Sequence, residues 1–594
     1  DGTFIIDSML NTGTCLDSQP NGVSEVLDGR NVMQEPSNAD DRSQRWYFIE
    51  AGSADSQSIS ASAEYSSDGN HLTKTTDERG NTAAYSYDGK GLLSSTIDAG
   101  NSTTNYTYNA DNDRLTKVQS GNSQITYSYQ KDRLSSISAD GRNVQYLLGY
   151  DSRGRRTTTE VGSAGGVTRT LSSSQWNARN LLTCMTYGNG QSVNYIYDSM
   201  DRVVGKGYNG NTNIFGYVYD ANGRLGLIKD RANNRYTRYT YDLSGRLAEA
   251  STKSSDMRTN PHEELPLYGK ISYAYEDGTN RISGLVYNMP LDSSLTSHWT
   301  DTVGMVYDAG GNCDRVKNVR LNGSNRLTFS YDSLGRVIQR SYSSTNGSTY
   351  RVTNYSYVPG NGSGSTTALL ASVSNSGLGK LSYTYDSRGN ITTVSKDGVV
   401  QESYKYDELN QLRTATKNGV TTTYTYDNRG NILSRSAAGG STVEYAYGDS
   451  QWKDLLTSYN GQSITSDEIG NPLSYRDGMN FTWQNGRQMA TFRKAGVSAS
   501  YAYGADGQRV SKTVNGVKTV YCRAGDQNIG YCRDDGTILE YIFDGNGNLY
   551  GISYEDSKIN GTGNGQTYYF AYNAQGDVIG LYNFAGVLVA AYSY

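Results

Sequence analysis

Several residue types are scarce in this 594-residue chain, and each scarcity excludes a class of protein. It has 3 His, 7 Pro and 5 Cys, its hydrophobic fraction is 35%, and its mean hydropathy is −0.66. The longest apolar stretch, 587–592, is far shorter than a membrane span, which predicts a soluble chain without a transmembrane segment. The net charge of −5 and a pI near 5.5 leave no basic surface for a nucleic-acid partner.

The same scarcity argues against an enzyme. The histidines His71, His262 and His298 are not spaced with Cys or carboxylates as metal ligands are. No Gly-x-Ser-x-Gly elbow and no phosphate-binding loop occurs, so we expect no catalytic residue, no metal and no cofactor. The acidic stretch 544–548 resembles a calcium loop but lacks the downstream bidentate Glu, and we interpret it as a hairpin turn.

The five cysteines leave the redox compartment open. Cys522 and Cys532 are close enough in sequence to suggest a bridge across one hairpin, and the odd total leaves at least one thiol unpaired.

What the chain has in abundance is tyrosine, with 52 copies, and glycine, with 67. Tyr-Asp pairs and their relatives recur at a nearly fixed spacing. They stand 21 residues apart at 87, 108, 129 and 150, and 22 residues apart at 197, 219 and 241; after 385 the steps are 21 and 20. A constant period of this length indicates one supersecondary unit stacked many times.

Each repeat predicts a β-hairpin. In the stretch from Tyr217 to Leu225, alternation places Tyr217 and Tyr219 on one face of a strand. Asp220 can then bond its own backbone and Gly223 can close a type I turn. The same chemistry recurs at Tyr241, Asp242 and Gly245 and at Tyr331, Asp332 and Gly335. Turn chemistry explains the Tyr-Asp pair, so we assign these positions a structural role.

The composition also constrains the sheet. A two-layer sandwich needs a dry face of Val, Ile and Leu, whereas a single wetted sheet favours side chains with an apolar body and a polar tip. We therefore expect a sheet one layer thick over much of its extent, covered by Tyr ladders. Disorder is excluded because disordered chains are poor in aromatic residues. No segment has sustained helical periodicity. Residues 250–266 and 359–365 interrupt the period and are predicted to be inserted loops.

The first fifty residues lack the period. Their Cys15-Leu16-Asp17 stretch and the Gln44-Arg45-Trp46 triplet resemble one lobe of a ricin-type β-trefoil lectin. The resemblance implies that Asp17, Gln44 and Trp46 contribute to a carbohydrate-binding site for cell-surface glycans. The alternative is a structural lobe in which Trp46 is a core residue. Residues 51–63 are predicted to be a linker, because they are Ser/Ala/Gly-rich and lack apolar periodicity.

Residues 219–225, 241–247 and 331–337 resemble the repeat of the Rhs/YD-repeat family, and the resemblance covers 64–594. That family includes bacterial polymorphic toxins, the cocoon components of insecticidal toxin complexes, and animal teneurins. The resemblance implies an all-β fold in which a spiralling strip of hairpins forms a hollow shell. In toxin members the shell encapsulates the protein's own C-terminal effector, which self-cleavage separates from it.

The segment 576–594 is similar to the last repeats of bacterial members, so the core-end motif, the self-cleaving aspartates and the effector are expected downstream of it. The leading hypothesis is a non-enzymatic bacterial toxin shell, secreted or delivered at the cell surface. Two alternatives stay open: a cell-surface adhesion or carbohydrate-binding protein, and a structural wall component.

Overall fold

The computed structural model describes residues 57–139, 141, 144–163, 168–255, 265–290, 295, 298–308, 315–343, 349–544, 546–556 and 566–593. These residues form two antiparallel sheets of 35 and 13 strands. The first runs from β1 (Ser62–Tyr65) to β35 (Gln462–Ser463), and the second from β36 (Thr465–Ser466) to β48 (Leu588–Ala591). Helix occurs as short 3-10 turns such as η2 (Arg476–Gly478). The all-β prediction is confirmed.

Each repeat is one hairpin, as the period predicts. In the repeat that ends at Tyr241, β16 (Leu225–Asp230) pairs antiparallel with β17 (Arg235–Tyr241), and β17 pairs with β18 (Leu247–Ser254). The preceding strand, β15 (Asn211–Tyr219), pairs with β16. Strands therefore pair with their neighbours in the chain, which gives a long meander rather than a set of separate domains.

A β-bulge adjoins the tyrosine at the end of many repeat strands. The register shifts between Val218 and Tyr219, between Thr240 and Tyr241, and between Ser330 and Tyr331. A bulge bends its strand and increases the local twist. Because the bulge recurs at the same place in successive repeats, the strip curves steadily instead of extending as a flat sheet.

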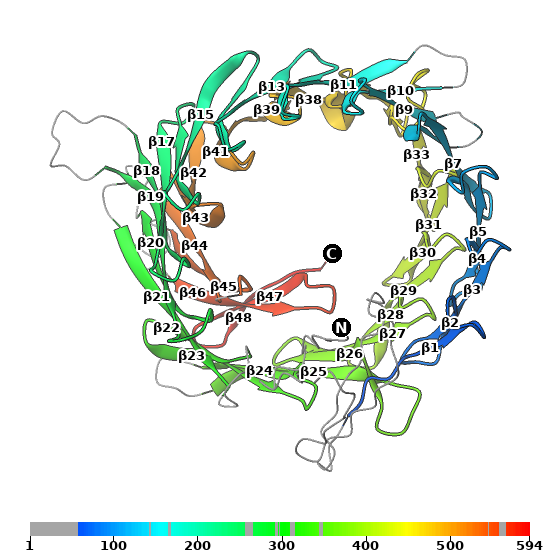
Figure 1. The fold of residues 1–594 in the computed structure, drawn as a ribbon. Coiled ribbons are helices and arrows are strands. Elements are labelled where there is room, and N and C mark those ends of the chain that lie inside the picture. Colours follow the sequence, from blue (N-terminus) through cyan, green and yellow to red (C-terminus); the bar gives the residue numbers. More distant parts are fainter. Residues whose placement is uncertain are drawn as a thin grey trace, which may run out of the picture.

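The curved strip coils around an open centre, and its C-terminal strands β47 (Val578–Asn583) and β48 lie inside the ring of strands (Figure 1). Contacts between successive turns of the coil show how many residues one turn takes. The sequence separation is 307 for Arg79 with Asp386, 306 for Tyr146 with Trp452, 299 for Lys206 with Ala505, 228 for Tyr342 with Phe570, and 191 for Tyr383 with Ala574. The coil therefore tightens toward its C-terminal end.

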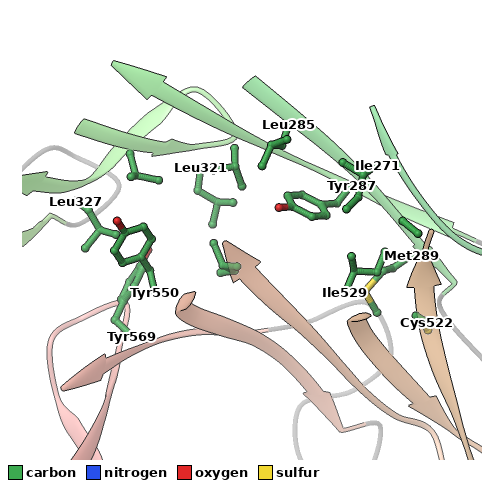
Figure 2. Packing of buried hydrophobic residues seen from close by; sticks show 14 of the residues in the cluster. Ile271, Leu285, Tyr287, Met289, Leu321, Leu327, Cys522, Ile529, Tyr550 and Tyr569 are labelled. Atoms are coloured by element: carbon green, nitrogen blue, oxygen red, sulfur yellow. The ribbon is translucent and has the colours of Figure 1, made fainter. Parts of the chain in front are cut away.

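The largest hydrophobic core lies between two turns of this coil (Figure 2). On one side are strands of the first sheet, including β19 (Leu267–Tyr275), β20 (Ile282–Pro290) and β24 (Val337–Ser343). On the other are strands of the second sheet, including β42 (Val517–Ala524), β43 (Gln527–Arg533), β44 (Thr537–Phe543) and β46 (Gln566–Tyr572). Tyr287, Met289, Cys522 and Ile529 are fully buried there. The expectation of a single-layered sheet does not hold for this part of the molecule.

The interruptions of the period are partly as predicted. Strand β25 (Thr349–Pro359) ends where the predicted loop 359–365 begins, and β26 (Thr366–Asn375) follows it, so this loop is confirmed. The proposed insertion 250–266 was drawn too wide, because β18 continues to Ser254 and β19 begins at Leu267. Ala250, Ser251 and Thr252 lie within β18 and are buried.

Candidate functional site

The repeated turn is built around one aspartate. In the turn after β15, the Gly223 N–H donates to the Asp220 carbonyl oxygen (3.0 Å), and Asp220 N–H donates to the Arg224 carbonyl oxygen (2.8 Å). The Asp220 carboxylate oxygen Oδ1 accepts from the N–H groups of Asn222 and Arg224, both at 2.9 Å. Gly223 has φ of +81°, a conformation that favours glycine. The aspartate thus closes the turn with both its backbone and its side chain.

An arginine connects each of these turns to the next repeat. Arg224 Nε donates to Asp220 Oδ2 at 2.8 Å, and its guanidinium lies over the ring of Tyr241, 4.3 Å from the centroid. Arg246 repeats the pattern with Asp242 and lies 4.3 Å from the Tyr275 centroid; Arg336 repeats it with Asp332. A Cβ on Gly245 would lie 3.3 Å from Arg224 Nη1, so the glycine also leaves room for this arginine.

The tyrosine hydroxyls connect the repeats in the opposite direction. Tyr219 donates to the Val203 carbonyl oxygen (2.8 Å), Tyr241 to that of Leu225 (2.9 Å), and Tyr331 to that of Val316 (2.7 Å). In these three repeats the acceptor is the first residue of the strand that opens the preceding repeat. The same bond is made by Tyr87, Tyr108, Tyr129, Tyr150, Tyr197, Tyr385, Tyr406 and Tyr426.

Tryptophan takes the place of tyrosine in two repeats. Trp176 Nε1 donates to the Arg156 carbonyl oxygen at 2.9 Å, and Trp483 Nε1 donates to that of Pro472 at 2.7 Å. Tyr and Trp share a large apolar ring and one polar hydrogen that can reach a backbone acceptor. An aromatic side chain with a hydrogen-bond donor therefore recurs at this position, where phenylalanine could not make the bond.

The carboxyl groups of two turn aspartates, Asp151 and Asp220, have a lowered pKa. Hydrogen bonding by the Arg155 backbone is the largest influence on Asp151, and it lowers the pKa of that carboxyl despite partial desolvation. At Asp220 desolvation raises the pKa, but the backbone and side-chain hydrogen bonds from Arg224 together outweigh it, and the net pKa is lowered. These two turns therefore stabilise the ionised carboxylate.

A pocket of about 480 Å³ lies between two turns of the coil. Its lining comes from β16, β17 and β18 on one side and from residues 504–526 on the other. Two of its charged groups are paired with each other. Arg523 forms an ion pair with Asp506, and Asp230 accepts hydrogen bonds from the backbone and side chain of Asn233. This pocket is a junction between turns and does not assemble a nucleophile with a general base.

The remaining candidates from the sequence have these outcomes. In the stretch 544–548, the Asp544 carboxylate accepts from Asn546, Asn548 and Tyr550, so the hairpin-turn interpretation is confirmed. Within the described ranges there is no group of three His, Cys, Asp or Glu residues that could hold a metal ion. Asp17, Gln44 and Trp46 of the lectin-like lobe lie outside the described residues, as does His262.

In the part of the chain that the structure describes, no helix has the length and apolar character needed to cross a bilayer.

The strip of antiparallel hairpins coils inward, and Asp, Arg and Tyr side chains repeat the same contacts at each hairpin. This arrangement defines a repeat-shell fold. The sequence model of the RHS Repeat family matches residues 65–103 and 406–442. Among curated proteins, the chain is similar to the tRNA3(Ser)-specific nuclease WapA of Bacillus spizizenii, at 36% identity over 146 residues, and to the tRNA nuclease WapA of Bacillus subtilis, at 32% over 146 residues. Each match covers 23% of this chain and 6% of the relative's length.

Among solved structures, a crystal structure of TcdB2-TccC3-Cdc42 aligns with a TM-score of 0.63 at 13% identity. A crystal structure of TcdB2-TccC3 without its hypervariable C-terminal region gives the same values. In both, the alignment covers 90% of this chain and 32% of the other. The family model matches two short parts of the chain, and the structural likeness shows the fold. The chain spans about a third of the solved relatives and a small fraction of the curated ones.

Proposed function

We propose that this chain is the wall of a shell that encloses the C-terminal effector of a bacterial toxin delivered outside the producing cell. The main support for this proposal is that the strip coils inward around an open centre and that its last strands lie inside the ring (Figure 1). A chain that continued beyond β48 would start from inside the coil. The similarity to WapA nucleases and to the TcdB2-TccC3 fold supports the same proposal.

The seam between turns supports the proposal, because a container must resist passage through its wall. Arg388 Nε donates to Asp98 Oδ2 at 2.8 Å, and Arg169 Nη2 donates to Asp449 Oδ2 at 2.8 Å. Further along the seam, the Asn189 amide donates to Asp467 Oδ2 at 2.8 Å. Each contact joins segments about 280 to 290 residues apart. The rims of successive turns are thereby held together at several points.

In the described part of the proposed wall, the charged side chains make structural contacts. Its carboxylates and arginines are used in turn closure, in stacking on tyrosine rings and in the seam. Any hydrolytic activity of the whole protein would belong to the effector, and the self-cleaving aspartates of the family are assigned to no residue in this chain. The proposed role of the wall is therefore non-enzymatic.

The proposal is tested by purifying the protein from its native source and determining intact masses and peptide coverage. A separate fragment, encoded after Tyr594 and held without a covalent bond, is the expected result. Recovery of the shell alone, from cells shown to express the complete reading frame, would contradict it. A variant of the downstream cleavage residues would keep the fragment attached without releasing it from the shell.

A second candidate function is binding of cell-surface glycans by the first fifty residues. The Gln-x-Trp triplet at 44–46 and Asp17 motivate it. Glycan-array binding that is lost in both Trp46→Ala and Asp17→Ala would support it. Trp176→Tyr is the matched control, because tyrosine occupies the equivalent place in other repeats. An array without binding would instead favour a purely structural lobe.

A further inference from the structure

Two cysteines meet inside the core between the turns of the coil. Cys522 lies on β42 and Cys532 on β43, both are fully buried, and their Sγ atoms are 3.9 Å apart. Figure 2 shows Cys522 on the inner sheet, beside Met289 and Ile529. Neither thiol takes part in the β-turns of the repeats or in the polar contacts of the seam. The proposed shell function therefore does not account for this pair.

The local backbone brings the two sulfurs together. Cys522 is paired in register with Gly530, and Cys532 with Val520, so the two cysteines are diagonal neighbours on one face of the hairpin. Gly530 has φ of +154°, and a Cβ there would lie 2.1 Å from the Leu539 carbonyl oxygen and 2.8 Å from Met289. With no side chain opposite Cys522, its thiol can lean toward Cys532. A β-bulge directly after Cys522 adds local twist.

The packing of the outer turn closes access to the pair. A Cβ on Gly269 of β19 would lie 2.8 Å from the Arg523 carbonyl oxygen, so the two layers are in direct backbone contact next to Cys522. Burial, and then the neighbouring Cys532 thiol, raise the pKa of Cys522 well above its usual value. The thiolate is the reactive form of cysteine, so the folded pair resists thiol–disulfide exchange.

We propose that Cys522 and Cys532 form a redox site whose state is set while the shell folds and is then retained. In an oxidising compartment, one thiol loses its proton and attacks a small disulfide oxidant such as oxidised glutathione. The second thiolate then displaces the glutathione thiol from the mixed disulfide. The Sγ–Sγ bond forms, two protons leave the cysteines, and two electrons reduce the oxidant to two thiols. In a reducing compartment the pair is buried as two thiols.

The geometry requires only a small local movement for this reaction. The sulfurs must approach from 3.9 Å to the covalent length of about 2.05 Å, a shift of roughly 1 Å for each. The pair then reports the compartment in which the shell folded, because later exposure of the folded protein to oxidant or reductant does not reach it. For a protein proposed to leave its cell, this distinguishes folding before export from folding after it.

The test uses the unmodified chain and trypsin, because Arg523 lies between the two cysteines. Cleavage at Lys518, Arg523 and Arg533 releases peptides 519–523 and 524–533, which stay joined only by a disulfide. The chain is refolded from denaturant with oxidised glutathione, or with reduced glutathione. Each sample is then alkylated in denaturant, digested and analysed by mass spectrometry. We expect the joined peptides from the first sample and two alkylated peptides from the second.

A second arm tests retention. The chain folded with reduced glutathione is transferred, still folded, to oxidised glutathione, and Cys184 serves as the internal control because it is only half-buried. We expect Cys184 to form a mixed disulfide while Cys522 and Cys532 stay thiols. Two separate alkylated peptides after oxidative refolding would overturn the disulfide. Joined peptides that appear as fast as the Cys184 adduct in the folded chain would overturn the retention.

Discussion

Truncation of Tyr342 is expected to loosen the contact between successive turns of the coil. Tyr342 on β24 is 1% exposed; its hydroxyl donates to the Phe570 carbonyl oxygen on β46 at 2.7 Å, and its ring lies 5.2 Å from that of Tyr569. The two strands are far apart in the sequence and meet only because the strip coils. Tyr342→Ala therefore removes a contact that belongs to the coil rather than to a single repeat.

The magnitude follows from what each substitution leaves behind. Tyr342→Ala opens a cavity in the core, and truncation of a buried aromatic residue costs about 3 to 5 kcal/mol. Tyr342→Phe keeps the ring and removes one hydrogen bond, which costs about 1 kcal/mol. The Phe570 carbonyl oxygen is not left unpaired in that variant, because Arg340 Nη2 donates to it at 2.9 Å.

Two assays read the effect. Urea unfolding gives the loss of stability, and hydrogen–deuterium exchange shows where the structure opens. In Tyr342→Ala, exchange is expected to rise in β46 as well as in β24. Ile338→Ala on the same strand is the control, because Ile338 is 38% exposed and its truncation should leave β46 protected.

The reasoning would be refuted by a rise in exchange that is confined to β24 and its chain neighbours. Such a result would mean that the two turns are not packed on each other through this residue. A loss of stability equal to that of Ile338→Ala would have the same meaning.

Three further predictions concern the repeat and the seam. Tyr241→Phe removes the hydrogen bond to the Leu225 carbonyl oxygen and should lower the free energy of unfolding by about 1 kcal/mol. Tyr65→Phe, at an exposed position, should leave it unchanged. Equal effects of the two substitutions in urea unfolding would contradict a stabilising role for this hydrogen bond. At Asp98, burial raises the pKa, but hydrogen bonds and charge from Arg388 lower it overall, so its stabilising contribution is present above pH about 4 and lost as pH falls further. The urea midpoints of Asp98→Asn and the parent chain should differ by a constant amount between about pH 7 and pH 5 and converge below about pH 4; convergence near pH 6 would contradict this expectation. Burial raises the pKa of Tyr569 to about 12, so its contribution to the free energy of unfolding is complete below about pH 10 and is lost as pH rises toward 12. Ultraviolet titration should therefore detect tyrosinate at higher pH in the native chain than in the urea-unfolded chain. Coincident titration curves would be incompatible with this burial.

The local structure could be predicted from the sequence because it depends on neighbouring residues. Alternation at Tyr217 and Tyr219, and turn chemistry at Asp220 and Gly223, are sufficient to predict strand, turn and strand. The period then predicts how many times the unit recurs. These parts of the fold are local and are repeated, so one correctly interpreted copy serves for the others.

Tyrosine ladders were expected, but the contacts that connect the repeats, arginine on a tyrosine ring and tyrosine hydroxyl to a backbone carbonyl, were not predicted, although the sequence contains a signal for them. Arg224 precedes Tyr241 by the same number of residues as Arg202 precedes Tyr219. In both cases the arginine of a β-turn lies over the tyrosine ring of the following repeat. The hydroxyl bond from tyrosine to a backbone carbonyl has a similar constant separation of 14 to 16 residues in regular repeats. The recurring spacing between Arg and the following Tyr is the feature of the sequence that indicates this pairing.

The contacts between turns could not be predicted, because they depend on the curvature accumulated over hundreds of residues. Arg388 resembles Arg153 and Arg429, which occupy the same place in other repeats, yet only its position in the coil brings it to Asp98. The buried core around Tyr287 and Ile529 has the same origin. This is why the second layer was missed.

The most direct test of the proposed shell is protease protection of the effector in the natural full-length protein. The intact protein, the Tyr342→Ala variant and the isolated effector are digested side by side, and effector peptides are followed by mass spectrometry. The account predicts that the effector persists in the intact protein, is cleaved faster in Tyr342→Ala, and is cleaved fastest alone. Cleavage in the intact protein at the rate of the isolated effector would contradict it.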